Sequence, residues 1–395
     1  MDDTEQKKQE KQEQQTDNDR PAATQRAADT ASFPHLLPRH KWPKSIPLGT
    51  LRKMRIPTRE HLVLPWLRQK ESAMVYAAPG VGKSLFAMSL ALAVAGGGKA
   101  LGKWDAPEGR RVLYIDGEMP IDDIQNRANM LIPSAGGSLE NIDRNLHIEA
   151  RQHQPSSSVF VDLSTEEGRE TLLYRIKNAG VELLILDNLS TLATVDDENS
   201  ASEFNDVVKF LLRMKQEGIA CVLVHHSNKA GGSYRGSSKL ATTFEVILRL
   251  EEATLKATDQ TDTTRFRLSW EKYRGRKEKG AGVPLDFALE EVLFDSPEGE
   301  TLKRGDLRWV CGRAEDTRLE ELVELVRTGE FKNQKELAAA FGVSTGAMTT
   351  WKTKAVGHGH ITAEEWTQYF PGTTGRKTGG GGRAKDDKCI ENSDF

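Results

Sequence analysis

The sequence predicts an α/β protein whose parallel sheet is covered by helices, followed by a small helical domain. Short, continuously apolar runs alternate with helical stretches through the middle of the 395-residue chain. Such runs are typical of parallel strands that are buried on both faces. A glycine-rich loop, "AAPGVGKS", follows the first run, and carboxylates follow two later ones. These features predict the fold class. They also indicate that the candidate functional residues follow the ends of the strands, along one edge of the sheet.

Five runs are expected to form the parallel strands, and the stretches between them to form helices. The expected strands are Met74–Ala77, Val112–Ile115, Leu183–Leu186, Cys221–Val224 and Val246–Leu250. The expected helices lie near 83–95, 121–131, 166–178 and 201–217. After them "TRFRLSWEKYR" and "VPLDFALEEV" alternate polar and apolar residues. That alternation predicts antiparallel strands at a sheet edge.

Composition divides the chain into four parts. Residues 1–45 are rich in Gln, Glu, Asp and Lys, which predicts a disordered tail. The α/β core is expected over 46–312, and a helix-turn-helix-like domain over 316–370. In that domain Gly342 follows one apolar helix face, and Ser344 or Thr345 can cap the next helix. Residues 371–395 are glycine-rich and locally basic, which predicts a flexible tail.

Charge and cysteine content exclude several classes of protein. The net charge of −3 shows that the chain as a whole is not a basic coat for nucleic acid, so such binding needs local patches. Three scattered cysteines form neither a disulfide framework nor a zinc-binding spacing. They are typical of a reducing cytoplasm. "SLFAMSLALAVAGGG" is too short to cross a bilayer, so no membrane association is expected.

The loop between the first strand and helix is predicted to bind the phosphates of ATP. Gly80 and Gly82 let backbone N–H groups face phosphate oxygens, and Lys83 adds a positive charge. Ser84 offers a hydroxyl to Mg²⁺. Ala77 stands where such loops usually have their first glycine. Alanine can occupy the end of a strand without strain. The predicted nucleotide-binding residues are Pro79, Gly80, Val81, Gly82, Lys83, Ser84 and Leu85.

Two strand ends carry carboxylates with expected catalytic roles. Asp187 follows "VELLIL" on a strand expected beside the loop, where it would complete the Mg²⁺ shell. Glu118 follows the strand "VLYID" and could polarise the attacking water, with Gly117 turning the chain toward the nucleotide. Asp116 is expected as its near neighbour. The alternative for each carboxylate is a cap for the following turn or helix.

Another strand ends on two histidines. His225 and His226 should point to opposite faces, so only one can sense the phosphate, and we assign His226. In the following loop Lys229, Arg235 and Lys239 could contact DNA phosphates, or the loop could simply be solvated. In the helical domain "STGAMTTWKTK" offers Thr349, Thr350, Lys352 and Lys354 for DNA contacts. That domain could equally contact another protein.

Together these motifs, from about residue 60 to 290, resemble the RecA-type hexameric ATPases among the AAA-like P-loop NTPases. The resemblance is greatest to plasmid replicative helicases of the RepA type, and more distant to the DnaB type. Its elements are "AAPGVGKS", "VLYIDGEM", "LLILDNLSTLATVDDENSASEF", "VLVHHSNKAGGSYRGSS" and "WEKYRGR". The resemblance implies that Glu118 acts on water and that the loop over about Asn228–Lys239 touches single-stranded DNA.

The resemblance also implies an oligomer. A Lys-x-Arg pair in such proteins enters the neighbouring subunit's nucleotide site, which here gives Lys272 and Arg274 catalytic roles. It implies ATP and Mg²⁺ as cofactors, a homo-hexamer, single-stranded DNA as partner, and a replication initiator or primase as a possible further partner. The expected activity is ATP hydrolysis that drives a ring-forming helicase of a plasmid, phage or integrated element.

Two other functions fit the same residues. One is a RecA-like, DNA-dependent ATPase that mediates recombination or loads another protein. The other is a nucleotide-switched DNA-binding regulator that uses the carboxy-terminal domain to find its site. The pattern Glu118, Lys272 and Arg274 favours turnover over a pure switch.

Overall fold

A computed structural model describes residues 43–193, 204–227, 234, 238–253, 262–275, 282–292 and 302–371. The chain divides into two compact units, Met1–Thr58 and Arg59–Phe395. In the first unit the described residues form one short helix, α3 (Leu48–Lys53), which buries none of its side chains. The tail expected over 1–45 lies almost entirely outside the described residues, as does the tail expected over 371–395.

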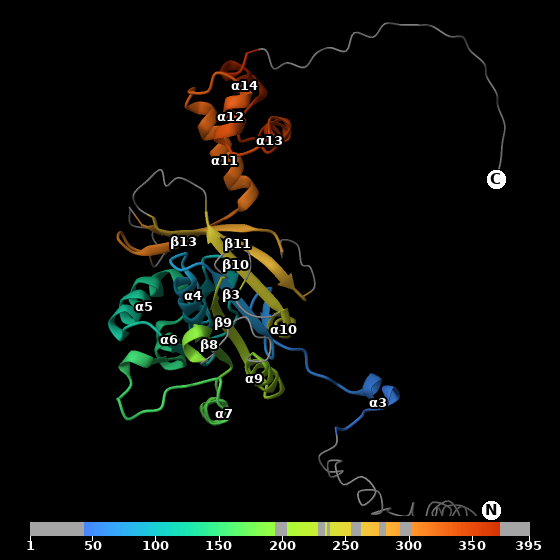
Figure 1. The fold of residues 1–395 in the computed structure, drawn as a ribbon, viewed down its shortest axis with the longest axis vertical. Coiled ribbons are helices and arrows are strands. Elements are labelled where there is room, and N and C mark those ends of the chain that lie inside the picture. Colours follow the sequence, from blue (N-terminus) through green and yellow to red (C-terminus); the bar gives the residue numbers. More distant parts are fainter. Residues whose placement is uncertain are drawn as a thin grey trace, which may run out of the picture. The chain divides into compact units, whose positions relative to one another are not determined.

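The second unit is built on a nine-stranded sheet with the order β13-β12-β11-β10-β3-β9-β8-β6-β7 (Figure 1). From β10 to β7 all neighbouring strands are parallel. These strands are β3 (Ser72–Ala77), β6 (Val112–Asp116), β7 (Leu146–Ala150), β8 (Leu183–Asp187), β9 (Ala220–His226) and β10 (Val246–Glu252). All five predicted parallel strands are confirmed. β7 was not predicted, because its half-buried sequence "LHIEA" lacks a continuous apolar run.

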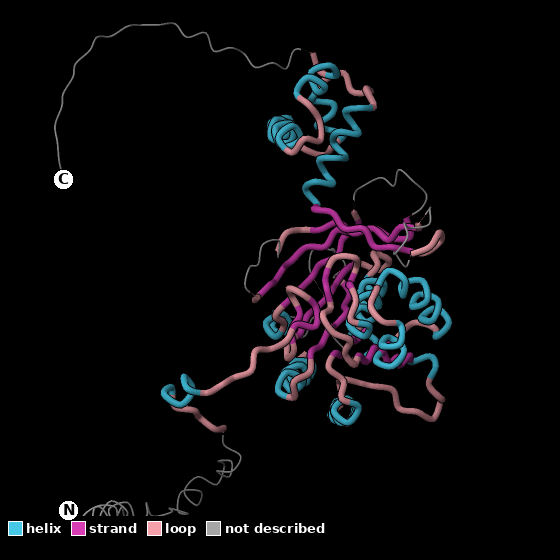
Figure 2. Tube along the Cα trace, turned by 180° about the vertical axis from the view of Figure 1, so that it is seen from behind, coloured by secondary structure: helices cyan, strands magenta, loops and turns pink. Residues whose placement is uncertain are grey.

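Helices cover both faces of the parallel strands (Figure 2). In the parallel strands other than β7, alternate residues belong to two separate apolar clusters, one on each face. The first cluster contains side chains of α4 (Lys83–Gly96), α5 (Ile121–Ala135) and α6 (Leu139–Asn145). The second contains side chains of α7 (Glu166–Ala179), α8 (Leu189–Leu192) and α9 (Asn205–Gln216). The four helices predicted from the sequence are therefore present, with ends shifted by a few residues.

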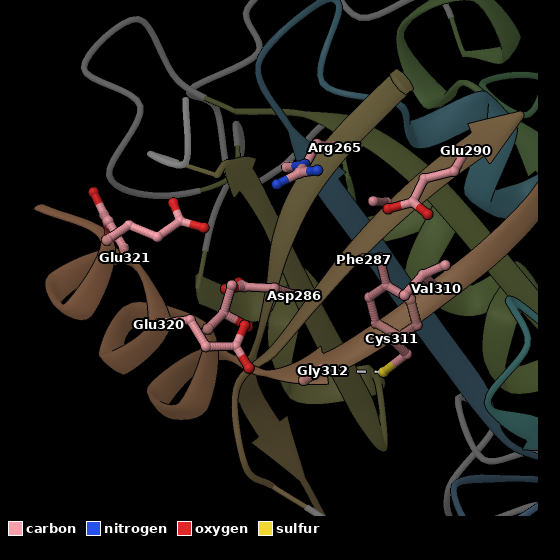
Figure 3. A pocket seen from close by; sticks show the side chains of 12 residues that line it. Arg265, Asp286, Phe287, Glu290, Val310, Cys311, Gly312, Glu320 and Glu321 are labelled. Atoms are coloured by element: carbon pink, nitrogen blue, oxygen red, sulfur yellow. Dashed lines mark hydrogen bonds between the residues drawn. The ribbon is translucent and has the colours of Figure 1, made fainter. Parts of the chain in front are cut away.

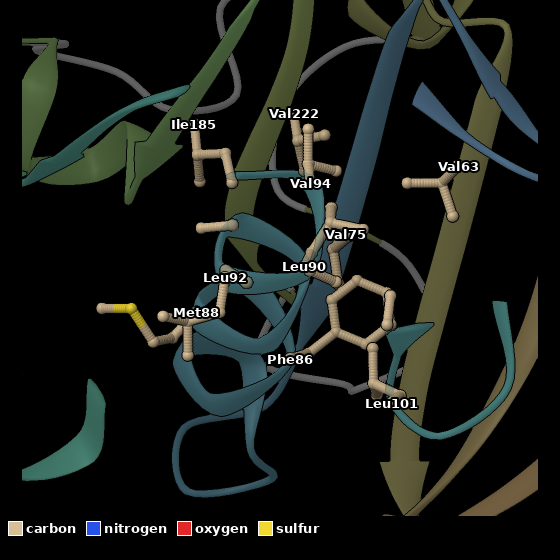
Figure 4. Packing of buried hydrophobic residues seen from close by; sticks show 14 of the residues in the cluster. Val63, Val75, Phe86, Met88, Leu90, Leu92, Val94, Leu101, Ile185 and Val222 are labelled. Carbon is tan, nitrogen blue, oxygen red and sulfur yellow. The ribbon is translucent and has the colours of Figure 1, made fainter. Parts of the chain in front are cut away.

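Helix α4 lies at the centre of the first cluster. Twelve of its fourteen residues are buried, so it is apolar on every side rather than amphipathic. Phe86 and Leu90 pack beside Val75 of β3 and Val222 of β9 (Figure 4). This packing fixes the first turn of α4 relative to the strand that leads into it. The glycine loop between them is thus held between two rigid elements.

The sheet continues as an antiparallel extension. It consists of β11 (Asp262–Tyr273), β12 (Leu285–Glu291) and β13 (Leu307–Arg313), each antiparallel to its neighbour. The first two were predicted from their alternation. β13 was not, because Trp309 is its only buried residue. The Trp309 indole N–H donates to Ser89 Oγ at 2.8 Å, which ties this strand to α4.

Smaller elements complete the second unit. They are the hairpin strands β1 (His61–Val63) with β2 (Leu67–Arg68) and β4 (Lys99–Ala100) with β5 (Trp104–Asp105), the 3-10 turn Arg151–His153, and α10 (Ser238–Thr243). Among the described residues no helix combines the length and apolar character that a bilayer span requires.

Four helices follow β13 and share an apolar cluster of their own. They are α11 (Ala314–Arg327), α12 (Gln334–Ala340), α13 (Thr345–Gly357) and α14 (Ala363–Tyr369). Between α12 and α13 the chain turns in four residues, with Gly342 at φ 74°. Ser344 caps α13 by accepting a hydrogen bond from the N–H of Ala347 at 3.2 Å. This helix, short turn and helix match the expected helix-turn-helix.

Candidate functional site

The glycine loop leaves β3 at its carboxyl end and enters α4. Gly80 and Gly82 have φ values of 84° and 111°, which only glycine adopts without strain. A Cβ at Gly82 would also fit tightly, 3.1 Å from Thr264 Oγ1 and 3.3 Å from Phe266. Ala77 is the last, buried residue of β3 and has no unusual φ, so alanine is tolerated there.

Lys83 holds the two sides of this loop together. Its Nζ donates to the carbonyl oxygens of Ala77 at 3.2 Å and Ala78 at 2.8 Å. Only 7% of the residue is exposed, and burial lowers the pKa of its ammonium group, against the opposing effect of Asp187 and Glu118. The positive charge therefore lies under the loop, close to two carboxylates and to the exposed residues Pro79 and Gly80.

Asp187 ends β8 and is 4% exposed. The Tyr114 hydroxyl donates to its Oδ2 at 2.6 Å, and the Ser84 hydroxyl also hydrogen-bonds it. Burial raises the pKa of Asp187, and these two hydrogen bonds act against that rise. The expectation that its strand lies beside the loop strand is wrong, because β9 separates β3 from β8. Asp187 still reaches Ser84, since it lies on the α4 face of the sheet.

Asp116 and Glu118 have different roles at the end of β6. Asp116 is 2% exposed, and its Oδ1 accepts the N–H groups of Glu118 at 2.8 Å and Met119 at 2.6 Å. Burial raises the Asp116 pKa to about 6. Asp116 thus shapes the turn that carries Glu118. The Glu118 side chain is exposed, and its Oε2 accepts a hydrogen bond from Asn188 Nδ2 at 2.6 Å.

Gly117 has a different purpose from the one expected. Its φ is not positive, so the turn does not require glycine. A Cβ at this position would lie 2.1 Å from Thr191 Oγ1 and 2.9 Å from Thr191 Cβ. Close approach of α8 therefore requires the glycine, and this contact brings Asn188 within reach of Glu118.

The two histidines of β9 face opposite sides, as predicted. His225 is 1% exposed and its ring contacts Phe204 edge-on, with centroids 6.4 Å apart, within the α7 and α9 cluster. Val222 and Val224 lie in the α4 cluster, so strand alternation places His226 on the α4 face. His226 is half-buried there and pairs in register with Ala77, the residue before the glycine loop. Its role as phosphate sensor stays a prediction.

Lys272 and Arg274 do not join the glycine loop of their own chain. Lys272 Nζ donates to Ala241 O at 2.6 Å, and Arg274 donates to Thr242 O at 3.2 Å, both at the end of α10. Burial, followed by the neighbouring Arg274, lowers the pKa of Lys272. Tyr273, between them, pairs with Val246. Lys272 and Arg274 therefore lie near the amino end of β10, whereas the carboxylates lie at the carboxyl ends of β6 and β8.

Two of the expected DNA-binding residues, Lys229 and Arg235, lie outside the described structure. Of Lys239 only the backbone, within α10, is described. In the helical domain Thr349 and Thr350 are exposed on α13. Lys352 lies over the ring of Trp366 at 5.6 Å, and Lys354 forms an ion pair with Glu315.

Sequence reasoning missed three residues that build the site. Tyr114 positions Asp187, and Asn188 and Thr191 position Glu118. The signal for Tyr114 was its alternation with Asp116 in "VLYID", which places both side chains on one face. Asn188 directly follows the strand-end Asp187 and was open to the same argument. Thr191 could not be found, because only the tertiary contact with Gly117 reveals it.

The residues present fit a nucleoside triphosphate with Mg²⁺. The loop backbone and Lys83 suit the phosphates, while the Ser84 hydroxyl and Asp187 carboxylate are the hard oxygen donors that Mg²⁺ prefers. Bound Mg²⁺ would neutralise charge on the phosphates. Glu118, held by Asn188, can accept a proton from water at this edge of the sheet. The site thus has the parts needed for phosphoanhydride hydrolysis.

One protein-family model matches the part of the chain that holds this site. Residues 43–232 match the family model of an AAA domain. Among solved structures it is similar to the flagellar accessory protein FlaH from Methanocaldococcus jannaschii, with 11% identity and a TM-score of 0.39. That alignment covers 61% of this chain and 90% of FlaH. No curated protein sequence matches the chain.

A hollow of about 420 Å³ lies between the antiparallel strands and α11 (Figure 3). Asp286 and Glu290 of β12 and Glu320 and Glu321 of α11 line it. Arg267 binds Asp286 through both oxygens, at 2.8 and 2.9 Å. Among its charged lining residues five are carboxylates and only Arg265 is a cation, so this pocket is unsuited to a triphosphate, and we assign the nucleotide to the glycine loop.

Proposed function

We propose that the chain is a ring-forming, ATP-driven motor that moves on single-stranded DNA, as the replicative helicase of a plasmid, phage or integrated element. The proposal has three parts: ATP turnover, a site shared between subunits, and contact with DNA. Each rests on different residues, so each can fail separately.

Turnover is supported by the separation of roles among the carboxylates. Asp187 is buried beside Ser84, and Asp116 is occupied by two backbone N–H groups. Glu118 alone among these three is exposed. An accessible carboxylate next to a buried metal-binding pair is what water activation requires. A nucleotide switch without turnover would not need it.

The position of Lys272 and Arg274 is the observation that carries the proposal. Tyr273 pairs with Val246 of β10, which in turn pairs with Ala73 near the start of β3. The glycine loop, in contrast, begins after Ala77, at the other end of β3. Four residues of strand separate the two levels, or roughly 13 Å. The pair therefore cannot serve the site of its own chain while β11 stays in the sheet. Arg274 is exposed, so a second subunit that docks its glycine loop here could use the guanidinium to stabilise phosphoryl charge.

Contact with DNA is supported by the helix-turn-helix of α12 and α13. Thr349 and Thr350 are exposed on the second helix, where hydroxyl groups suit phosphate contacts. The ion pair of Lys354 with Glu315 removes one cation from that surface. Affinity for DNA must therefore come mainly from other cations, and the residues after β9, Lys229 and Arg235 among them, are our candidates.

The test combines ATP hydrolysis with and without single-stranded DNA, particle mass with nucleotide, and subunit mixing. Arg274→Ala and Glu118→Gln should each bind ATP but hydrolyse it slowly. Mixed together, they should recover part of the activity, because some interfaces then pair an intact Arg274 with an intact Glu118. Arg308→Ala, an exposed arginine on β13, is the matched control and should keep wild-type activity.

The outcomes separate the alternatives. A ring-sized particle with DNA-stimulated hydrolysis and strand unwinding supports the helicase. DNA-stimulated hydrolysis by a filament, without unwinding, indicates a recombination mediator or loader. A monomer whose slow hydrolysis ignores DNA, and which binds a specific duplex tightly, indicates a nucleotide-switched regulator. No recovery of activity in any mixture refutes the shared site.

A further inference from the structure

We propose that the helical domain binds a divalent metal ion such as Zn²⁺ through Asp316, His358 and His360. One ligand atom from each of these residues lies within 4.8 Å of the other two. Asp316 belongs to the first turn of α11, whereas His358 caps the end of α13 and His360 follows two residues later. Figure 1 labels both helices. The site is independent of the glycine loop and of the proposed motor.

The sequence "HGH" brings two imidazoles together only because of the turn at its centre. His358 is the C-cap of α13, and Gly359 follows with φ 78°. The N–H of Gly359 donates to Val356 O at 3.1 Å, and the N–H of His360 donates to Ala355 O at 3.0 Å. These two bonds form a Schellman motif, which reverses the chain at the helix end. The imidazole centroids are consequently 6.3 Å apart, with an angle of 34° between the rings.

The third ligand is already in position. Asp316 Oδ1 lies 3.3 Å from His358 Nδ1. In a tetrahedral zinc site with bonds of about 2.0–2.1 Å, two ligand atoms are about 3.3–3.4 Å apart. Asp316 and His358 therefore hold one edge of such a tetrahedron. A ligand atom of His360 lies within 4.8 Å of both of these, so a shift of its ring toward them would complete the third vertex.

The surrounding packing supports a fixed site. Leu319 of α11, Ala355 of α13 and Ile361 are all buried in the same apolar cluster, so the backbone near all three ligands is anchored. The nearby cation Lys354 is neutralised by its ion pair with Glu315. Imidazole nitrogens favour zinc, copper and nickel over Mg²⁺, so millimolar Mg²⁺ in an ATPase assay would not fill the site. Water can supply the fourth ligand, since His358 is exposed.

A bound ion would fasten the end of α13, the second helix of the helix-turn-helix, to the start of α11. Because α11 follows β13 directly in the chain, the ion would link this helix to the strand that ends the sheet. The role of such an ion would be structural, because it would join two helices of the domain.

The test is calorimetric titration of the full chain with Zn²⁺ in excess Mg²⁺, which occupies the oxygen-ligand sites. We expect the wild type to bind one equivalent of Zn²⁺. The double variant His358→Ala/His360→Ala should not bind it, and Asp316→Asn should bind it at least 10-fold more weakly. His147→Ala/His153→Ala removes two exposed histidines elsewhere and should keep the equivalent. Zn²⁺ should raise the Tm of the wild type and of this control, but not that of His358→Ala/His360→Ala.

Two results would overturn the assignment. Unchanged stoichiometry and affinity in His358→Ala/His360→Ala would show that zinc binds elsewhere and that His358 and Asp316 form only an ion pair. Unchanged affinity in Asp316→Asn would remove the carboxylate from the ligand set. All variants should keep the wild-type Tm in the presence of a chelator, because none of the three side chains is fully buried.

Discussion

Replacing Tyr114 by phenylalanine tests whether a hydroxyl on the neighbouring strand holds Asp187 in place. Tyr114 is 0% exposed, and its hydroxyl donates to Asp187 Oδ2 at 2.6 Å. Phenylalanine keeps the buried ring and removes only this hydroxyl. A hydrogen bond to a charged group contributes about 1.5–3 kcal/mol, so the free energy of unfolding should fall by about that amount. This corresponds to a roughly 10- to 150-fold smaller folding equilibrium constant.

The same change should alter catalysis through the pKa of Asp187. The Tyr114 hydrogen bond lowers that pKa against the effect of burial, so the pKa should rise in Tyr114→Phe. The metal-binding form of Asp187 is the carboxylate, and it would then be lost at a higher pH than in the wild type. We expect the acid limb of the ATPase pH profile to move to higher pH, and the Mg²⁺ concentration for half-maximal activity to increase.

Urea unfolding and Mg²⁺ titrations of ATPase activity measure both effects. Tyr174→Phe is the matched control, because Tyr174 is 68% exposed on α7 and the same chemical change there should leave both measurements unaltered. A Tyr114→Phe protein with the stability and Mg²⁺ dependence of the wild type would refute the reasoning. A loss of stability without any change in Mg²⁺ dependence would limit Tyr114 to a structural role.

Three further predictions concern neighbouring residues. Lys83→Ala should abolish ATP hydrolysis, because it removes the charge under the loop; normal turnover in this variant would contradict the assigned site. Asp116 has a folded pKa of about 6 against an ordinary value of 3.8, so the folded protein retains a proton between these values that the unfolded chain has lost. The contribution of Asp116 to the stability of the wild type therefore falls as the pH rises through that window. The difference in free energy of unfolding between Asp116→Asn and the wild type should shift in favour of the variant by about 1.4 kcal/mol from pH 5 to pH 8. An equal difference at both pH values would show that the Asp116 pKa is not raised. Gly117→Ala should cost about 1–3 kcal/mol because its Cβ would meet Thr191, whereas Gly346→Ala, with open space around it, should be neutral or stabilising; equal melting temperatures of the two variants would contradict this.

The sequence by itself determined the fold class and the position of the glycine loop. Strands buried on both faces must be continuously apolar, and that requirement is visible without coordinates in β3, β6 and β8. The positions of Asp187 and Glu118 followed from the ends of the apolar runs, and the opposite orientation of the two histidines followed from period-two alternation. Strands with a single buried residue, such as β13, give no such signal and were missed.

Only the tertiary structure decided how these residues meet. Strand order is set by which apolar faces pack together, so the sequence could not show that β9 separates β3, which leads into the glycine loop, from β8, which ends at Asp187. Contacts between distant segments determine the remaining roles: Thr191 requires Gly117 to be a glycine, Tyr114 holds Asp187, and α10 binds Lys272 and Arg274. The pairing of "HGH" with Asp316 belongs to the same class, because about 40 residues separate partners that only the packing of α11 against α13 brings together.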